Sequence, residues 1–216
     1  MQPTNIAPSP EGTRLALIEA GFRLFGQHSF AATSTRQLAA RANANIGSIA
    51  YHFGGKDGLR QACAEEVARR MAEIPAAVPI QTMPSIGEAR LQLQAILRSL
   101  VRFLFVGPQA ETMLPFMLRE LSENGPAVEV LYTHMVGPIH GRLCRLWGAA
   151  TGQDPETDAV RLLVFSLIGQ ALYFRVGAPI VTRRLGWPNI GPTETAQITQ
   201  TLLGTLDALL AASERP

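Results

Sequence analysis

Residues 33–59 read TSTRQLAARANANIGSIAYHFGGKDGL, and this stretch encodes two short helices with a tight turn between them. Ser34 and Gln37, three residues apart, form a capping box, in which each side chain accepts a hydrogen bond from the other residue's backbone amide. Because this pairing satisfies amides that otherwise lack partners at a helix start, we predict a short helix that begins after Ser34 and ends near Arg41.

The second helix of the stretch is predicted from the turn before it. Asn43-Ala44-Asn45 contains residue types that favour turns, and the Asn45 side chain can cap the next helix. That helix is expected from Ile46 to about Phe53, where Gly54-Gly55 closes it. Two short helices joined in this way have the dimensions of a helix-turn-helix unit, whose second helix reads the DNA major groove.

The predicted second helix carries groups suited to DNA. Small and polar residues at its start, 45–48, can approach base edges, while the helix dipole and free backbone amides would face phosphates. Tyr51, His52 and Lys56 follow, with a hydroxyl, an imidazole and an ammonium that can bind phosphate oxygens. Spacing alone also fits a helical hairpin in an ordinary bundle, so both interpretations stay open at this point.

Further helices are predicted on both sides of this unit. Apolar residues three or four positions apart over 15–25 predict a helix before it, and the same spacing over 59–71 predicts one after it. The latter is expected to begin near Lys56 and to stop at Pro75. Strand patterns are scarce throughout, so the fold class is all-α, with a three-helix head at the N-terminus.

A larger helical body is predicted after the Pro-rich residues 75–84. Apolar stripes indicate helices around 93–104 and 113–121. A third helix is expected over 126–151, and Gly137-Pro138 should bend it, because proline lacks the amide that completes the helical hydrogen bond.

The last part of the body is predicted to contain two more helices. Residues 161–176 are apolar on nearly every side, so this helix must be buried or lie in a subunit interface. Residues 177–192 are expected to form an irregular connector, and about 193–212 the final helix. One seam of that helix contains Ile198, Leu202, Thr205 and Leu209.

Composition excludes several classes of protein. The chain has 216 residues, 47% hydrophobic and 17% charged, which suits one or two folded domains. Polar residues and glycine interrupt its most apolar stretch before the roughly 18 apolar residues of a membrane span. Residues 1–10 lack the features of a secretory signal and are expected to be a disordered lead. We therefore expect a cytoplasmic protein without a membrane partner.

Charge and chemistry-bearing residues narrow the function further. Residues 1–60 carry six Lys/Arg against three Asp/Glu, which fits a phosphate-binding head but can also arise by chance. Cys63 and Cys144 are too far apart for a metal-binding pair, and His140 with Cys144 supplies only two ligands. Because phosphate-loop and nucleophile motifs are also missing, we predict no enzyme activity, no catalytic residue, no metal and no cofactor.

Residues 33–42 and 47–59 closely resemble the DNA-binding head of TetR-family transcriptional regulators, over about residues 13–65 in all. The most specific part is Tyr51-His52-Phe53 with Lys56 three residues later. The resemblance implies that the start of the helix after Ser34 contacts the DNA backbone and that the helix from Ile46 lies over the major groove. It also implies that residues at and beyond the end of that second helix contact phosphates. The residues so implied are Thr33, Ser34, Thr35, Arg36, Asn45, Ile46, Gly47, Ser48, Tyr51, His52 and Lys56.

The body is similar to the CecR-like branch of that family, in Gly169-Gln170, Phe174-Arg175 and 184–187. The family implies that the last two long helices, about 158–176 and 193–212, pair with a second copy in a four-helix interface. Such a homodimer would present two heads to a palindromic operator in double-stranded DNA.

A small-molecule effector is a further expected partner, because a helical body rich in apolar residues can leave a cavity between its helices. The candidate effector-binding residues are Leu100, Phe103, Met113, Met117, Glu120, His134 and Phe165. The alternative is that these methionine and phenylalanine side chains simply fill the core.

The sequence thus predicts four segments: a lead (1–10), a helix-turn-helix DNA-binding domain (11–56), a connecting helix and linker (57–79), and an effector-binding and dimerisation domain (80–216). The favoured interpretation is a dimeric, ligand-responsive repressor that its effector releases from DNA. The alternative is an all-helical small-molecule-binding or catalytic protein without sequence-specific DNA binding.

Overall fold

The computed structural model describes residues 9–72 and 83–213, and within these ranges all regular structure is helical. The chain forms two compact units. The first contains Met1–Arg70 and Glu111–His134, and the second contains Met71–Ala110 and Met135–Pro216. Residues 1–8 of the predicted lead and most of the Pro-rich linker lie outside the described residues, whereas Ser9 and Pro10, also predicted as lead, cap and begin the first helix.

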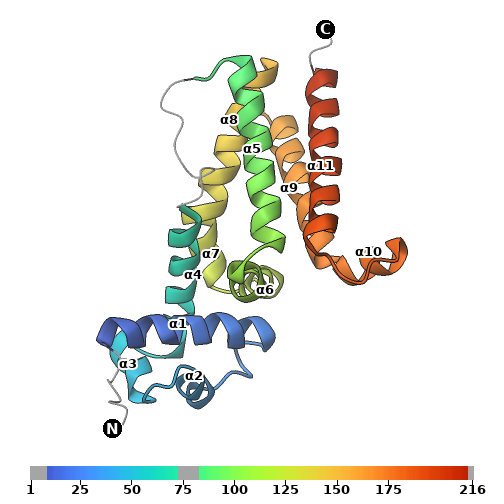
Figure 1. Ribbon diagram of the computed structural model, residues 1–216. Helices are drawn as coiled ribbons and strands as arrows, with labels where there is room; N and C mark the ends of the chain where they lie inside the picture. The colour runs from blue at the N-terminus through green and yellow to red at the C-terminus, as the bar shows by residue number, and fades with distance from the viewer. Residues whose placement is uncertain (1–8, 73–82, 214–216) are drawn as a thin grey trace, which may run out of the picture. The chain divides into compact units, whose positions relative to one another are not determined.

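Four helices begin the first unit: α1 (Pro10–Gln27), α2 (Thr35–Arg41), α3 (Gly47–Phe53) and α4 (Lys56–Ala72) (Figure 1). Helix α1 packs against both short helices. The apolar stripe predicted for α1 supplies much of the core, although Leu15 at its start is exposed. The fully buried side chains of these helices include Leu17, Ile18, Phe22, Phe25, Leu38, Ile49 and Leu59.

Helices α6 (Pro108–Glu123) and α7 (Ala127–Leu131) lie largely in the first unit too. The buried Phe116 ring has its centroid 5.7 Å from that of Phe22 and 6.4 Å from that of Phe25. A Cβ at Gly26 would come within 2.9 Å of the Phe116 amide nitrogen, so glycine is what permits this approach of α1 to α6. The sequence-based division at residue 80 therefore does not coincide with the compact units.

The regular α-helix predicted over 126–151 is interrupted just before Gly137-Pro138. The expected helix over 126–151 is divided into α7, a π-helical turn η2 (Tyr132–Val136) and α8 (Gly137–Thr151). The π turn ends at Val136, directly before Gly137-Pro138, and the ring and missing amide of Pro138 prevent the regular hydrogen bond to His134. Proline at the start of α8 is tolerated, because first-turn amides have no helical partner.

The second unit is built on α5 (Ile86–Phe105), α8, α9 (Asp158–Val176) and α11 (Pro192–Ser213), each of which contacts the other three (Figure 1). Helix α5 begins with a second capping box, Ser85 with Glu88. The seam predicted for the last helix faces mostly into this unit, where Ile198 and Leu202 are buried. The face that α11 leaves exposed contains small residues instead: Ala196, Gly204, Ala208 and Ala211.

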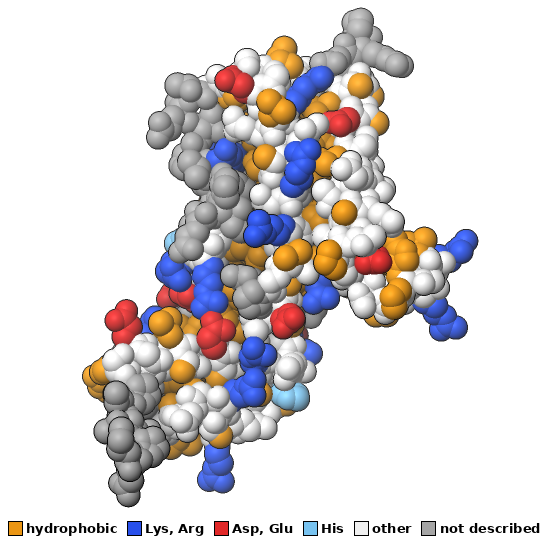
Figure 2. Space-filling model, viewed as in Figure 1, with side chains coloured by type: hydrophobic (Ala, Val, Ile, Leu, Met, Phe, Trp, Pro, Cys, Tyr) orange, Lys and Arg blue, Asp and Glu red, His pale blue; other side chains and the backbone are white. Residues whose placement is uncertain are grey.

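The expectation of an irregular connector over 177–192 is wrong for its first half. Residues Ala178–Leu185 form helix α10, with Pro179 in its first turn and Gly186 at φ +69° closing it. Proline in the first turn does not break a helix, so Pro179 starts α10 where the sequence suggested irregular backbone. Figure 2 shows hydrophobic and basic side chains exposed on this helix.

Helix α9 leaves a broad apolar face uncovered. Among the described helices, α9 is long and apolar enough to cross a membrane, judged by length and composition alone, with a mean hydropathy of 1.5 over an 18-residue window. Only 17% of that window is buried in the structure. The exposed face contains Leu162, Phe165, Tyr173 and Val176. The sequence predicted burial or an interface for this helix, and burial within the chain does not account for it.

Candidate functional site

The turn between α2 and α3 is held by asparagine. Asn43 adopts φ +50°, the left-handed conformation that asparagine tolerates better than most residues. Asn45 Oδ1 accepts from the Gly47 amide at 2.9 Å and so orders the turn just before α3, but the N-cap residue is Ile46, which makes no side-chain capping bond, and not Asn45 as predicted. Gly54, at φ +72°, ends the helix. Local chemistry therefore sets where α3 begins and ends.

Helix α3 presents side chains to solvent rather than free amides. Tyr51 is 81% exposed and its ring meets that of His52 edge-on, with centroids 4.9 Å apart. The amides of Ser48 and Ile49 donate to the carbonyls of Asn45 and Ile46. The amides of Gly47, Ser48 and Ile49 are therefore not free to face phosphates as the sequence led us to expect, which leaves side chains as the main contacting groups of this helix.

Most of the predicted DNA-contacting residues lie at the surface of the first unit. Those exposed are Ser34, Arg36, Asn45, Ile46, Gly47 and Tyr51, and those half-buried are Thr35, Ser48, His52 and Lys56. Ser34 forms the predicted capping box with Gln37, so its hydroxyl is already engaged. Thr33 differs from the prediction. It is 1% exposed, and its hydroxyl donates to carbonyls of Leu24 and Ser29, so its side chain stabilises the head from inside.

Lys56 connects the start of α4 to the loop before α2. Its ammonium donates to the carbonyls of Phe30 at 2.9 Å and Thr33 at 3.0 Å, and lies 4.2 Å from the Phe30 ring centroid. An ammonium carries three N–H donors. Two are engaged inside the head, so one remains for a phosphate.

A buried ion pair continues this network to α6. Arg60 Nε lies 2.6 Å from Glu120 Oε1, and the Arg60 guanidinium lies 4.5 Å from the Phe30 ring centroid, on which Lys56 also rests. Glu120 was predicted as a polar group for an effector. The structure pairs it with Arg60 instead, sixty residues away in the chain.

A second charged cluster lies between α4 and α1. The nearly buried Glu66 accepts from Arg69 at 2.8 Å and from Arg70 at 2.7 Å, and Arg70 also reaches Glu19. Hydrogen bonds from Arg69, and then from Arg70, lower the pKa of Glu66 from 4.5 to about 2. This carboxylate stays ionised in the folded protein well below neutral pH.

Comparisons with known families agree with this architecture. Residues 17–63 match the family described as bacterial regulatory proteins, tetR family. Residues 89–213 match the C-terminal domain of the HTH-type transcriptional dual regulator CecR. The chain is also 30% identical over 207 residues to the HTH-type transcriptional dual regulator CecR of Shigella flexneri, across 93% of this chain and 92% of that protein. The chain belongs to the TetR family. It is a transcriptional regulator, not an enzyme.

Other relatives of this TetR-family regulator extend the comparison. The HTH-type transcriptional regulator BetI of Paraburkholderia phymatum is 28% identical over 135 residues, covering 62% of this chain and 66% of that protein. A transcriptional regulator from Pseudomonas aeruginosa has a similar structure, with a TM-score of 0.69, 22% identity, and coverage of 96% and 94% of the two chains. A TetR-like regulator from Rhodococcus has a TM-score of 0.65 at 19% identity, over 92% and 96%. These two structures share the fold.

The predicted effector-binding residues are divided between the two compact units. Met113, Met117, Glu120 and His134 belong to the first unit, whereas Leu100, Phe103 and Phe165 belong to the second. Both methionines are buried, so the core interpretation fits them better. His134 is exposed, and Phe165 stacks on His140 with ring centroids 3.9 Å apart.

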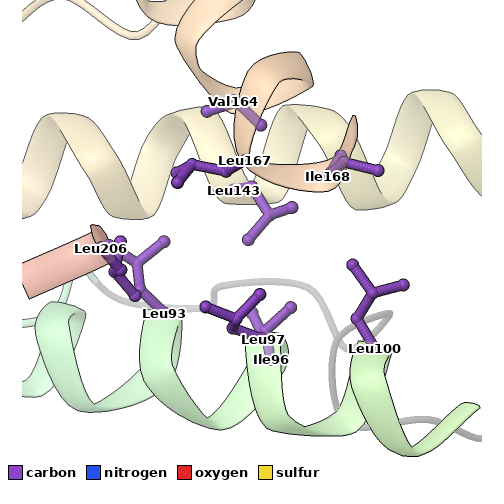
Figure 3. A pocket seen from close by; sticks show the side chains of 9 residues that line it. All are labelled: Leu93, Ile96, Leu97, Leu100, Leu143, Val164, Leu167, Ile168 and Leu206. Carbon is purple, nitrogen blue, oxygen red and sulfur yellow. The ribbon is translucent and has the colours of Figure 1, made fainter. Parts of the chain in front are cut away.

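A small apolar cavity of about 30 Å³ lies between α5, α8, α9 and α11 (Figure 3). Leu100 is the only predicted effector residue in its lining. The other lining residues are Leu93, Ile96, Leu97, Leu143, Val164, Leu167, Ile168 and Leu206. The apolar spacing of these residues is the same as that of ordinary core residues. The sequence therefore contains no signal that would have identified them as the lining of a cavity.

Within the described residues, no group of three His, Cys, Asp or Glu could hold a metal ion. Cys144 Sγ lies 3.7 Å from His140 Nδ1, and burial raises the pKa of its thiol. This pair therefore has the character of core packing rather than of a nucleophile.

Proposed function

We propose that this TetR-family regulator binds a palindromic operator as a homodimer, represses transcription, and is released by a small-molecule effector. The observation that carries the DNA-binding step is the exposed α3 face, where Tyr51 projects from a helix that Asn45 and Gly54 delimit. A rigid helix with exposed polar side chains is what major-groove recognition requires.

Roles at the operator follow from exposure and chemistry. Asn45, Ile46, Gly47, Ser48 and Tyr51 would contact bases, because they belong to the start and exposed face of α3. Thr35, Arg36, His52 and Lys56 would contact the DNA backbone, and Ser34 would do so by exchanging its hydrogen bond to Gln37 for one to a phosphate. We leave the Thr33 side chain out of this set, since it is buried.

Dimerisation through α9 and α11 accounts for the uncovered apolar face of α9. Leu162, Phe165, Tyr173 and Val176 would be covered by a second copy, and the small exposed residues of α11 would allow close approach of its partner helix. This assignment keeps the helices predicted from the sequence but replaces the predicted α11 seam with the small-residue face.

The effector would bind in the second unit, at the cavity between α5, α8, α9 and α11. Effector binding weakens operator binding only if the effector prefers a conformation whose heads do not match the two half-sites. The division into a DNA-binding head and a regulatory, dimer-forming body is part of this proposal. We expect the regulator in the cytoplasm, where its DNA is.

The test is selection of the purified protein against a random duplex DNA library at near-physiological salt. We expect enrichment of a palindrome, and relaxed sequence preference for Tyr51→Ala and Ser48→Ala. Arg36→Ala should instead weaken binding to all sequences. If a folded dimer enriches no motif, the alternative of a helical protein without sequence-specific DNA binding is favoured. Promoter fusions then separate repression from activation.

A further inference from the structure

Arg142 lies in an apolar stripe of α8. Ile139, Leu146 and Ala150 lie three to four residues apart along the same helix face as Arg142, and Leu146 and Ala150 are almost fully buried. Helical periodicity therefore predicts an apolar side chain at position 142, where the chain has an arginine. A charged residue at a core-facing position needs an explanation beyond packing.

The guanidinium of Arg142 is under-satisfied. Its Nη2 donates to Gln92 Oε1 of α5 at 3.1 Å, while its Nε and Nη1 are buried without a hydrogen-bond partner in the structure. In the described part of the chain, no ion pair joins Arg142 to a carboxylate. Burial, and then the nearby cation Arg145, lowers the pKa of Arg142. Two donor nitrogens, which carry three N–H groups, and a positive charge thus lack an acceptor in a partly dehydrated place.

The pair lies close along α5 and α8 to residues that line the apolar cavity, although neither Gln92 nor Arg142 is itself part of the lining. Gln92 lies one helical turn before Ile96 on α5, and Arg142 directly precedes Leu143 on α8, and both Ile96 and Leu143 line the cavity. Figure 3 shows Leu143 pointing from α8 toward the leucine and isoleucine side chains of α5. A polar group bound to Arg142 would therefore have an apolar surface next to it.

We propose that Arg142, oriented by Gln92, binds the carboxylate of an effector whose remaining surface is apolar and lies in this cavity. The proposal rests on the proposed function and specifies the chemistry of its effector. A guanidinium binds a carboxylate with strong, charge-assisted hydrogen bonds, and a carboxylate placed end-on would supply an acceptor for Nη1 and for the second N–H of Nη2. A cavity of about 30 Å³ holds little more than a water molecule, so the apolar part must separate the helices that line it.

The test compares sodium octanoate with 1-octanol as ligands of the purified full-length protein. The two probes have the same chain length and differ in charge. We expect calorimetry to show octanoate binding at least tenfold tighter than octanol, because a hydrogen bond to a charged group stabilises more than a neutral one. Arg142→Gln should weaken octanoate binding at least tenfold. Arg145→Gln, which removes the same charge from an exposed position of the same helix, should leave it unchanged.

Thermal unfolding without ligand gives a second readout. If Arg142 had a purely structural role, replacing it would lower the stability of the protein. If it serves a ligand, its buried charge is uncompensated while the ligand is absent, so replacing it should not lower the stability. We therefore expect the Tm of ligand-free Arg142→Gln to equal or exceed that of the unchanged protein. Four results would each overturn the proposal. They are a lower Tm for Arg142→Gln, equal binding of octanoate and octanol, no octanoate binding, and unchanged octanoate binding by Arg142→Gln.

Operator selection on the same preparation separates this proposal from the proposed function. A protein that enriches a palindrome but does not bind octanoate through Arg142 refutes the carboxylate site alone. A protein that binds octanoate through Arg142 but enriches no DNA sequence refutes the regulator alone.

Discussion

Lys56 combines two roles in one side chain. Because its ammonium holds the Phe30 and Thr33 carbonyls, we expect Lys56→Ala to lower the Tm of the protein as well as its operator affinity. If the third donor contacts a phosphate, the slope of log affinity against log salt should fall by about 1. Arg36→Ala is the matched comparison, since Arg36 is exposed: the salt slope should fall equally with no change in Tm. An unchanged Tm for Lys56→Ala would contradict the network.

Glu66 should make the protein sensitive to acid. Its pKa is about 2 when folded and 4.5 when free, so the folded state binds its proton less readily. The stabilisation is complete above pH 4.5 and is lost as the pH falls from 4.5 towards 2. In urea unfolding at pH 7, we expect Glu66→Gln to have a free energy of unfolding lower by on the order of 2 kcal/mol. The stability of this variant should also depend less on pH in the acid range. Glu65→Gln, at an exposed neighbouring position, should retain the acid dependence.

Replacing either partner of the buried pair Arg60–Glu120 alone should lower the stability of the protein. Glu120→Gln leaves a buried guanidinium without its counter-charge, and we expect a loss of about 3 kcal/mol in the free energy of unfolding. Glu111→Gln, an exposed glutamate of the same helix, should change it little. If both variants unfold alike in urea, α6 is not held to α4 by this pair.

Capping boxes begin two of the helices, and they give a comparison at the level of elements. Ser34→Ala and Ser85→Ala remove the same hydroxyl from the starts of α2 and α5, and each should cost about 1 kcal/mol of stability. Only Ser34→Ala is expected to weaken operator binding, because α2 packs against α3. Ser34→Thr, which restores a capping hydroxyl, should rescue both losses. Equal DNA binding by Ser34→Ala, measured by fluorescence anisotropy, would contradict this.

Proline has different surroundings at the starts of α8 and α10. Pro138 follows a π turn, so the disturbance predicted from the sequence is real. Pro179 occupies the first turn of α10, where the sequence suggested irregular backbone. Both prolines lie in a first turn, where a missing amide is tolerated, and they differ in what precedes the helix: a π-helical turn before α8 and Gly177 before α10.

Dimerisation is a property of the whole molecule. Leu162 on α9 is 67% exposed in the single chain, and we expect Leu162→Glu to shift the protein towards monomer and to weaken operator binding. Leu91→Glu introduces the same change at an equally exposed leucine of α5 and should leave a dimer. Analytical ultracentrifugation measures whether each variant is a monomer or a dimer. A Leu162→Glu variant that stays dimeric would place the interface elsewhere.

The sequence by itself determined those features of this regulator that depend on residues close together in the chain. The capping box of Ser34, the asparagine turn and the glycine that ends α3 all act over three or four positions, so their chemistry can be read from spacing. Apolar periodicity likewise predicted most helices. The family resemblance over residues 13–65 added the DNA-contacting set, and burial then removed the Thr33 side chain from it.

Only the tertiary structure decided which distant residues meet. Arg60 pairs with Glu120 and Arg142 with Gln92 across fifty or more residues, and α6 packs with the head helices although it follows them by a long interval. Periodicity assigns a residue to a helix face but does not say which element covers that face. For this reason the cavity lining, the inward seam of α11 and the uncovered face of α9 could not be predicted: each depends on how helices pack, which local chemistry does not specify.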